Sequence, residues 1–392
     1  MKNFFKTSLA LLLGMFPSWG LALGDDLKFS AACGPSQHFA SISFVGDILI
    51  HKMLYVNVTQ ESQDFSQIWR AINPLFSKAH FSVANLEGPA ALGIDSQGRD
   101  WGDVGFIYDD RVYSGTNFSF NYHPRILTDL KKSGIDLLTL ANNHILDRTS
   151  LGIDRTLTAA QSAGMNVVGV RHSQDRNASF ARIVTVQGIS IAFVGCTEST
   201  NGRPDRKDQV LNCNQAQTEN VIKELSNRSD VDAVIIYTHW GDEYKQSPNS
   251  RQIANARKFL DAGAVAVIGS HPHVLQPWDK YVTKDGRETF IVYSLGNFVA
   301  AQKDVERKAS AVIYLGLAKK DQSKASITGV AYTPTVRSGY KILPVNSNGD
   351  RSVLNYLQKH FGKTGILNVD ESLPLKLCRK LPEQGSFGYK SR

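Results

Sequence analysis

Residues 251–273 read RQIANARKFLDAGAVAVIGSHPH, and this stretch indicates the fold class. Its first part, Arg251–Ala262, places apolar side chains three and four residues apart, which is typical of a helix with one buried face. The next part, Ala264–Ile268, is a short apolar run typical of a buried strand, and His271 and His273 follow it. A helix that leads into a buried strand predicts an α/β unit with polar side chains at the end of the strand.

The same alternation continues along the chain. Two further helices are predicted over Asp64–Ala79 and Pro124–Lys132. The predicted buried strands are Ala40–Val45, Phe81–Ala84, Ile135–Leu140, Ile189–Val194, Ala233–Tyr237, Ala264–Ile268, Phe290–Tyr293 and Ala311–Leu317. This alternation predicts an α/β fold with mostly parallel central strands. Because no repeat or linker is visible, we expect one main domain, residues 25–345, with residues 346–392 as a C-terminal extension packed on it.

The first 24 residues have the features of a signal peptide. A short basic start is followed by the apolar run Leu9–Phe16 and by Ala22-Leu23-Gly24, the small–x–small pattern of a cleavage site. The apolar run is too short to span a membrane. We therefore expect an exported protein, periplasmic or extracellular, with an uncleaved N-terminal anchor as the alternative.

The charge balance bears on the kind of partner. The net charge is +8, from 44 Lys and Arg against 36 Asp and Glu, and loss of Lys2 and Lys6 with the signal peptide leaves 42 − 36 = +6. The basic residues are scattered and not interleaved with aromatic residues, which argues against nucleic acid. A mildly basic surface suits an anionic polymer or a cell-envelope glycan, and ordinary solubility would explain it equally well.

The four cysteines are expected to form disulfides, because an exported protein meets an oxidising compartment and no C-x-x-C pair is present. Cys196 and Cys213 enclose a polar stretch and could close that loop. Cys33 and Cys378 lie near the two ends and could tie them together. Four cysteines allow three connectivities, so this pairing is a preference among them.

Polar side chains of metal-binding types follow one predicted strand after another. They are Asp47, Glu87, Asn143, His144, His239, His271 and His273. The carboxyl ends of parallel strands open onto one crevice, so these residues are expected to converge. Each alone is a weak signal, but together they predict a divalent-metal site. Carboxylate, amide and imidazole donors without thiolate suit one or two ions of Mn²⁺, Zn²⁺ or Fe²⁺.

Several motifs carry a resemblance to a known family. They are Asn85-Leu86-Glu87, Ala141-Asn142-Asn143-His144 with Asp147, His239-Trp240-Gly241 with Glu243-Tyr244, Gly269–Pro277, and Tyr293–Phe298. They resemble the CapA family of capsule and poly-γ-glutamate biosynthesis proteins, which has a metallophosphatase-like (calcineurin-like) fold. The resemblance runs from about Phe39 to Val336. It implies a four-layer α-β-β-α sandwich with a metal site at one edge.

The resemblance also implies roles for individual residues. One ion would be bound by Asp47 and His273, a second by His239 and His271, with Glu87 between them. Asn143 would be a further ligand. His144 would be the acid near the leaving group, with Asp147 as its orienting partner. Positions that could support the ligands or contact substrate are His51, Asn85, Asn142, Trp240, Glu243, Tyr244 and Asn297; for the aromatic residues among them, plain packing is the alternative.

Three departures from the family pattern affect the expected site. The histidine usually found two residues after the first aspartate is replaced by Leu49, and His51 is not expected to bind metal directly. The acidic residue after Asn-His is replaced by Ile145, and a glycine soon after Asp147 by Thr149. The first departure makes one complete ion site with a partial second one a real alternative.

The leading functional hypothesis is an exported, metal-dependent protein acting on poly-γ-glutamate or a related envelope or capsule polymer. Hydrolysis or transfer would use metal-bound hydroxide as nucleophile and His144 as general acid. One alternative is a metal-dependent phosphoesterase. Another is a non-catalytic accessory protein for polymer synthesis or export. In either case the protein could associate with envelope biosynthesis proteins.

Overall fold

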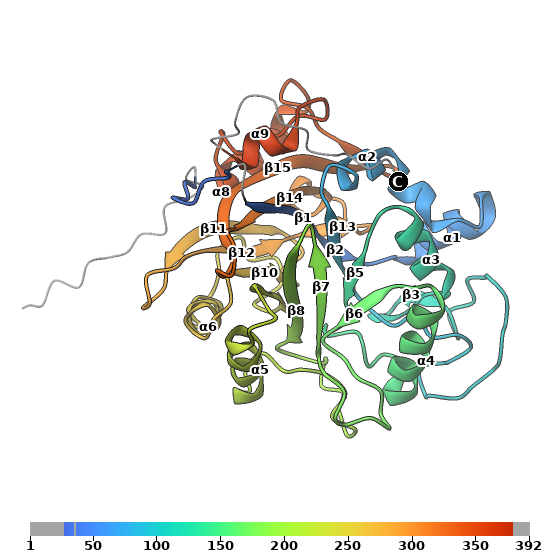
Figure 1. The fold of residues 1–392 in the computed structure, drawn as a ribbon. Helices are drawn as coiled ribbons and strands as arrows, with labels where there is room; N and C mark the ends of the chain where they lie inside the picture. Colours follow the sequence, from blue (N-terminus) through green and yellow to red (C-terminus); the bar gives the residue numbers. More distant parts are fainter. Residues whose placement is uncertain (1–26, 35–36, 379–392) are drawn as a thin grey trace, which may run out of the picture.

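The computed structural model describes residues 27–34 and 37–378, so the predicted signal peptide lies outside the described residues. Two β-sheets face each other, and helices cover their outer faces (Figure 1). This arrangement confirms the four-layer α-β-β-α sandwich expected from the sequence.

The first sheet has eight strands in the order β16-β15-β14-β1-β2-β5-β6, with β13 paired to β1. β1, β2, β5 and β6 run parallel to one another, whereas β14 runs antiparallel to β1. The bounds are β1 His38–Ile48, β2 Phe81–Leu86, β5 Leu137–Thr139, β6 Asn166–Val168, β13 Asn297–Val299, β14 Ala309–Lys319, β15 Ser326–Ser338 and β16 Lys341–Pro344.

The second sheet has six strands in the order β11-β12-β10-β9-β8-β7. Its four central strands are parallel, and its edge strands β7 and β11 are antiparallel to their neighbours. The bounds are β7 Ala181–Val186, β8 Ile189–Thr197, β9 Ala233–His239, β10 Ala266–Ser270, β11 Leu275–Val282 and β12 Glu288–Leu295. A separate hairpin pairs β3 (Ser114–Thr116) with β4 (Ser119–Asn121).

Helices form the two outer layers. α1, α3 and α4 lie beside the first sheet, and α5 and α6 lie beside the second (Figure 1). The helix bounds are α1 Lys52–Glu61, α2 Asn73–Phe76, α3 Arg125–Lys132, α4 Thr149–Ser162, α5 Ala216–Asn227, α6 Ser250–Asp261, α7 Val305–Lys308, α8 Arg351–Phe361 and α9 Leu373–Leu377.

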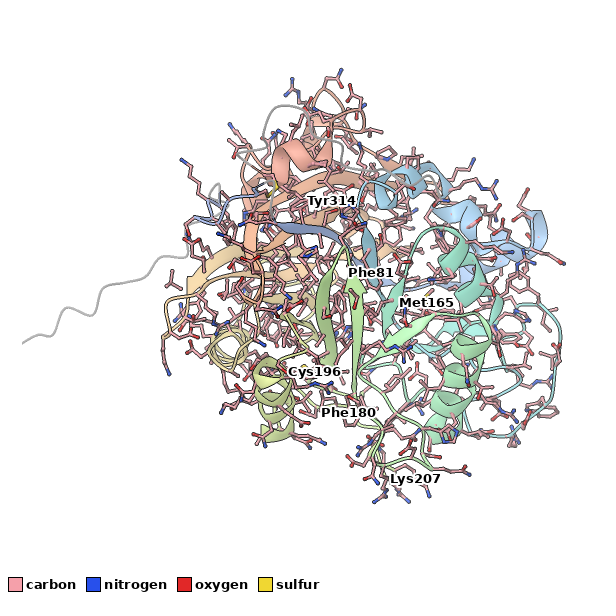
Figure 2. The ribbon with its side chains drawn as sticks, in the orientation of Figure 1. Phe81, Met165, Phe180, Cys196, Lys207 and Tyr314 are labelled. Atoms are coloured by element: carbon pink, nitrogen blue, oxygen red, sulfur yellow. A yellow bond between two sulfur atoms is a disulfide. The ribbon has the colours of Figure 1, made fainter. Side chains whose placement is uncertain are left out.

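The central core lies between the two sheets. Every β1 residue from Phe39 to Ile48 is buried, and Phe81 of β2 stacks on Phe193 of β8 with ring centroids 5.4 Å apart. Figure 2 labels Phe81 at this central position. A strand buried on both faces must be apolar on both, which explains the continuous apolar runs in the sequence.

The predicted helix over Asp64–Ala79 is wrong. Two short 3₁₀ turns, Phe65–Ile68 and Arg70–Ile72, and the four-residue α2 occupy this segment. Pro74 lies at the start of α2, where its missing N–H ends the hydrogen bonding of a continuous helix. The sequence interpretation also missed β15, which extends the first sheet beyond the last predicted strand.

Both preferred disulfide pairings, Cys196–Cys213 and Cys33–Cys378, are confirmed. The segment after residue 345 contributes α8, which contacts β11, β14 and β15, and α9, which contacts β14 and β15. Within the described ranges, none of the helices combines the length and the apolar character needed to cross a membrane.

Candidate metal centre

The carboxyl ends of the parallel strands from both sheets meet at one place. Near the end of β1, Asp47 is paired in register with Asn85 of β2 and with Asn297 of β13. In the other sheet, the last residue of β9, His239, is paired with Ser270 of β10. The hydroxyl of Tyr237 donates to the carbonyl of Val45 at 2.8 Å and so joins the two sheets beside these ends.

Asp47, Glu87 and His273 form the most deeply buried group, and each offers a ligand atom within 4.8 Å of the others. Nδ1 of His273 lies 3.4 Å from Oδ2 of Asp47, and its Nε2 lies 3.8 Å from Oε1 of Glu87. The two carboxylates have no exposed surface.

Glu87 also belongs to a second group of the same size with His239 and His271. Nε2 of His239 lies 3.5 Å from Oε1 of Glu87, and the rings of His239 and His271 are 4.7 Å apart. Glu87 thus belongs to two groups of possible ligands, and the family resemblance implies a bridging role for it.

A third group combines His271 and His273 with Glu243. Glu243 is exposed, unlike the other carboxylates of the centre. Glu243 therefore offers a carboxylate oxygen within 4.8 Å of a nitrogen of each histidine, from the exposed side of the cluster.

The buried polar atoms test whether these residues fit a cation. Among the described residues, neither carboxylate oxygen of Glu87 has a hydrogen-bond partner, and neither does Nδ1 of His271. A buried ionised carboxylate without partners is costly unless it is paired or coordinates a metal. The donors are carboxylates, imidazoles and an amide, with no thiolate, and this set suits Mn²⁺, Zn²⁺ or Fe²⁺. The residues fit a divalent ion.

The carboxylates are ionised despite their burial. Burial raises the pKa of Asp47, but the hydrogen bond to His273 and the charges of His239 and His273 lower it below the ordinary value. The pKa of Glu87 is also lowered, because the charges of His273 and His239 outweigh burial and the repulsion from Asp47.

The two histidines of the H-x-H motif differ in charge. Burial lowers the pKa of His273, but the charges of Glu87 and Asp47 raise it to about 9. The pKa of His271 is lowered, first by burial and then by the charges of His239 and His273. The His273 imidazolium therefore offsets part of the negative charge of the two carboxylates.

The backbone at this motif is strained. His271 has φ 96° and His273 has φ 58°, backbone angles that residues other than glycine rarely adopt. The amide of His271 donates to Oδ2 of Asp47 at 3.1 Å, and the amide of Tyr244 donates to the carbonyl of Pro272 at 2.7 Å. Such strain, of order 1–3 kcal/mol per residue, is concentrated at functional sites.

Neighbouring amides orient the ligands. Nδ2 of Asn85 donates to Oδ1 of Asp47 at 2.8 Å, and Nδ2 of Asn142 donates to Oδ1 of Asn85 at 3.2 Å. Oδ1 of Asn297 lies 3.0 Å from Nδ1 of His273. Asp47 and His273 are thus each held by an amide side chain from a neighbouring strand of the first sheet.

Asn143 and His144 lie at the edge of the ligand cluster. Oδ1 of Asn143 lies 2.9 Å from Nε2 of His239. Nδ1 of His144 lies 2.8 Å from Oδ2 of Asp147, which also accepts from the amide of Phe120 at 2.8 Å. The fixed carboxylate of Asp147 therefore sets the orientation of the His144 ring.

The remaining predicted positions divide into packing residues and rim residues. Trp240 is fully buried and its Nε1 donates to the carbonyl of Tyr293, so it packs in the core. Tyr244 is 44% exposed, and the centroid of its ring lies 6.1 Å from that of His273. His51 makes its contacts through the backbone of Leu49 and Ala301, and burial lowers its pKa to about 4.

Two residues outside the predicted set reach the centre. Nδ2 of Asn143 donates to Oδ1 of Asn201 at 3.3 Å, and Nε of Arg203 lies 3.3 Å from Oδ1 of Asp147. Both belong to the polar stretch between Cys196 and Cys213. The pair of cysteines was the only signal in the sequence that pointed to this loop.

Comparison with known proteins finds a family and several relatives that match most of the chain. The model of a family described as "Bacterial capsule synthesis protein PGA_cap" matches residues 41–302. The PGA biosynthesis protein CapA of Bacillus subtilis (strain 168) is 29% identical over 296 residues, which cover 75% of this chain and 72% of that protein. The capsule biosynthesis protein CapA of Bacillus anthracis is 28% identical over 356 residues, covering 87% of this chain and 78% of that protein.

Among solved structures, the NAD nucleotidase NadN of Haemophilus influenzae is similar with a TM-score of 0.46 and 15% identity. The match covers 85% of this chain and 57% of that chain.

Proposed function

Because the chain belongs to the bacterial capsule synthesis protein family PGA_cap, we propose that it is an exported, metal-dependent protein that hydrolyses or transfers an anionic envelope polymer such as poly-γ-glutamate. The observation that carries the proposal is the buried carboxylate of Glu87, which has no hydrogen-bond partner among the described residues and is surrounded by histidines. The polymer class is inferred from the two CapA relatives, a PGA biosynthesis protein and a capsule biosynthesis protein.

Export is supported by the two disulfides, since such bonds persist in oxidising compartments. The predicted signal peptide, residues 1–24, agrees with export and belongs to the proposal.

Asp47, Glu87, Asn143, His239, His271 and His273 would hold one or two ions. A divalent ion held there would act as a Lewis acid, which lowers the pKa of water and neutralises charge that develops on the cleaved group. Leu49, which replaces the histidine usual in the family, is buried in the core and offers no ligand atom. The set of metal-binding side chains is therefore more complete near His271 and His273 than near Leu49.

His144 would supply the proton. Its Nδ1 faces Asp147, so Nε2 is the ring atom left to donate to a leaving group. The ring also packs edge-on against Phe120, with centroids 4.7 Å apart, and only 4% of the residue is exposed. This packing limits the ring to one orientation and limits competing protonation by bulk water.

To test for turnover of the polymer, the purified protein and Mn²⁺ are incubated with poly-γ-glutamate and, separately, with a p-nitrophenyl phosphodiester. Polymer length is followed by gel electrophoresis and p-nitrophenol by absorbance. We expect a change in polymer length that is about 10²–10⁴-fold slower in His144→Ala, the usual size of a general-acid contribution. His172→Ala, on the surface beside Asp154, is the matched control and should keep the wild-type rate.

Two outcomes would contradict the proposal. Phosphodiester cleavage with no change in the polymer would identify a phosphoesterase. Polymer binding with no turnover of either compound would identify an accessory protein.

A further inference from the structure

The loop between Cys196 and Cys213 reaches the candidate metal centre from outside the ligand-bearing strand ends. We refer to residues 197–212 as the disulfide-closed loop. Both cysteines are fully buried, and the disulfide joins residues 17 apart in sequence. In Figure 2 Lys207 lies at the outer edge of the molecule, whereas Cys196 lies nearer the sheet.

The base of the disulfide-closed loop is bound to the strand that carries His239. The amide of Glu198 donates to the carbonyl of His239 at 3.0 Å. The amide of Thr197 donates to the carbonyl of Leu211, and the amide of Cys213 donates to the carbonyl of Thr197. The two ends of the loop therefore stay side by side next to β9, and the disulfide closes the same junction.

A tight turn presents the inner side of the loop. The hydroxyl of Thr200 donates to the carbonyl of Arg203 at 2.6 Å, and the amide of Arg203 donates back to the carbonyl of Thr200 at 3.0 Å. Asn201 has φ 52°, a left-handed conformation that asparagine tolerates better than most residues. The turn is fixed by its own hydrogen bonds.

From this turn, Asn201 contacts the amide of Asn143. Nδ2 of Asn143 donates to Oδ1 of Asn201 at 3.3 Å, while Oδ1 of Asn143 lies beside Nε2 of His239 at 2.9 Å. An asparagine side chain has one donor end and one acceptor end. Because Asn201 accepts from the donor end, the oxygen of Asn143 is turned toward the cluster.

We propose that Asn201 is a positioning residue for the metal site, and that the Cys196–Cys213 disulfide holds it against Asn143. The oxygen of Asn143 then already points toward the ion site, so the side chain need not change rotamer when an ion binds. Arg203, from the same turn, forms an ion pair with the neighbouring Asp147, its Nε lying 3.3 Å from Oδ1. The inference rests on the metal site of the proposed function and adds to it a loop that supplies no ligand of its own.

The test is the affinity for Mn²⁺, measured by competition with a fluorescent chelator and without any enzymatic assay. Asn201→Ala should weaken binding about 10–100-fold, the usual effect of losing a group that orients a ligand. Asn201→Asp keeps an oxygen acceptor for Nδ2 of Asn143 and should restore most of the affinity. Asn214→Ala, just beyond the loop, is the matched control and should bind as the wild type does.

The disulfide is tested by comparing two double variants. Cys196→Ser with Cys213→Ser should lose affinity. Cys33→Ser with Cys378→Ser should not, because these two cysteines pack in a different hydrophobic cluster from Cys196 and Cys213. Wild-type affinity in Asn201→Ala, or equal weakness in Asn201→Ala and Asn201→Asp, would overturn the inference alone. A wild-type protein that binds no Mn²⁺ would overturn the metal site of the proposed function as well.

Discussion

Glu87 is the residue at which burial and charge conflict most directly. Its carboxylate is fully buried, is ionised and lacks a hydrogen-bond partner within the described part of the chain. The nearby histidines offset part of its charge, but at distances of 3.5 and 3.8 Å they do not replace hydrogen bonds to it. An ion between these groups accounts for all three features.

This explanation predicts how Glu87→Gln responds to metal. At a Mn²⁺ concentration 100 times the dissociation constant, the wild-type free energy of unfolding should rise by about 2.7 kcal/mol. Glu87→Gln should show little of this increase, because the amide has a similar shape but no charge. Denaturant unfolding with and without Mn²⁺ measures the difference, with Glu219→Gln as the control, a half-buried residue of α5 paired with Lys223. An equal increase in Glu87→Gln would contradict the assignment.

Gly46 is required by a close approach of two backbones next to Asp47. A Cβ at this position would lie 1.9 Å from the carbonyl oxygen of Gly296, a backbone atom that cannot rotate away. Gly46→Ala should therefore lower the free energy of unfolding by about 3 kcal/mol or more. Thermal unfolding followed by circular dichroism measures this loss. Gly34→Ala, whose Cβ would meet only the side chain of Gln37 at 3.7 Å, should be close to neutral, and equal effects would contradict the argument.

At the scale of elements, the parallel strands explain how much of the site could be predicted from the sequence. Asp47, Glu87 and His239 each follow a buried apolar run in the sequence. Because the carboxyl ends of parallel strands converge, this pattern alone predicts that the three side chains lie close together. Asn201 could not be found in this way. Its approach to Asn143 depends on the path of an irregular loop, which no periodicity records.

The errors in the fold prediction have equally specific causes. The segment around Pro74 has helical spacing of apolar residues, but the proline interrupts the hydrogen bonding. β15 is 13 residues long and was missed because it follows the turn after residue 319 without a strong apolar run. Apolar periodicity therefore identified the central strands better than the peripheral elements.

Helix α8 carries a buried histidine that should make the protein sensitive to acid. His360 has no exposed surface, packs against Tyr356 and has a pKa lowered by burial to about 4. The unfolded chain takes up this proton near pH 6.5, so between about pH 6.5 and 4 protonation favours unfolding. The folded state should lose about 2 kcal/mol from this residue by pH 5.

His360→Gln removes the titrating group while keeping a polar side chain of similar size. We expect its free energy of unfolding to fall less than that of the wild type between pH 7 and pH 5. Urea unfolding at the two pH values gives the comparison. Identical pH dependence in the two proteins would show that His360 does not contribute.

At the scale of the whole molecule, the Cys33–Cys378 disulfide closes nearly the entire described chain. It joins residues 345 apart, and both sulfur-bearing residues are buried against the first sheet. A cross-link over so long a loop restricts the unfolded chain strongly, and its loss should cost about 2–5 kcal/mol of stability. Cys33→Ser with Cys378→Ser should therefore unfold at lower denaturant concentration. Unchanged stability would contradict this role.

The two sheets together form the candidate centre, since neither alone supplies all of its candidate ligands. Asp47 and Glu87 come from the first sheet, and His239, His271 and His273 come from the second. A site formed in this way requires the complete sandwich, which is why ligand residues more than 200 positions apart in the sequence can meet.

The most direct test of the metal centre is the metal content of the purified protein after incubation with Mn²⁺ and removal of free ion. Inductively coupled plasma mass spectrometry measures it. The wild type should retain a stoichiometric amount. The double variant Asp47→Ala, His271→Ala, checked for folding by circular dichroism, should retain almost none. Equal metal content in the two proteins, or none in the wild type, would contradict the assignment of this cluster as a metal centre.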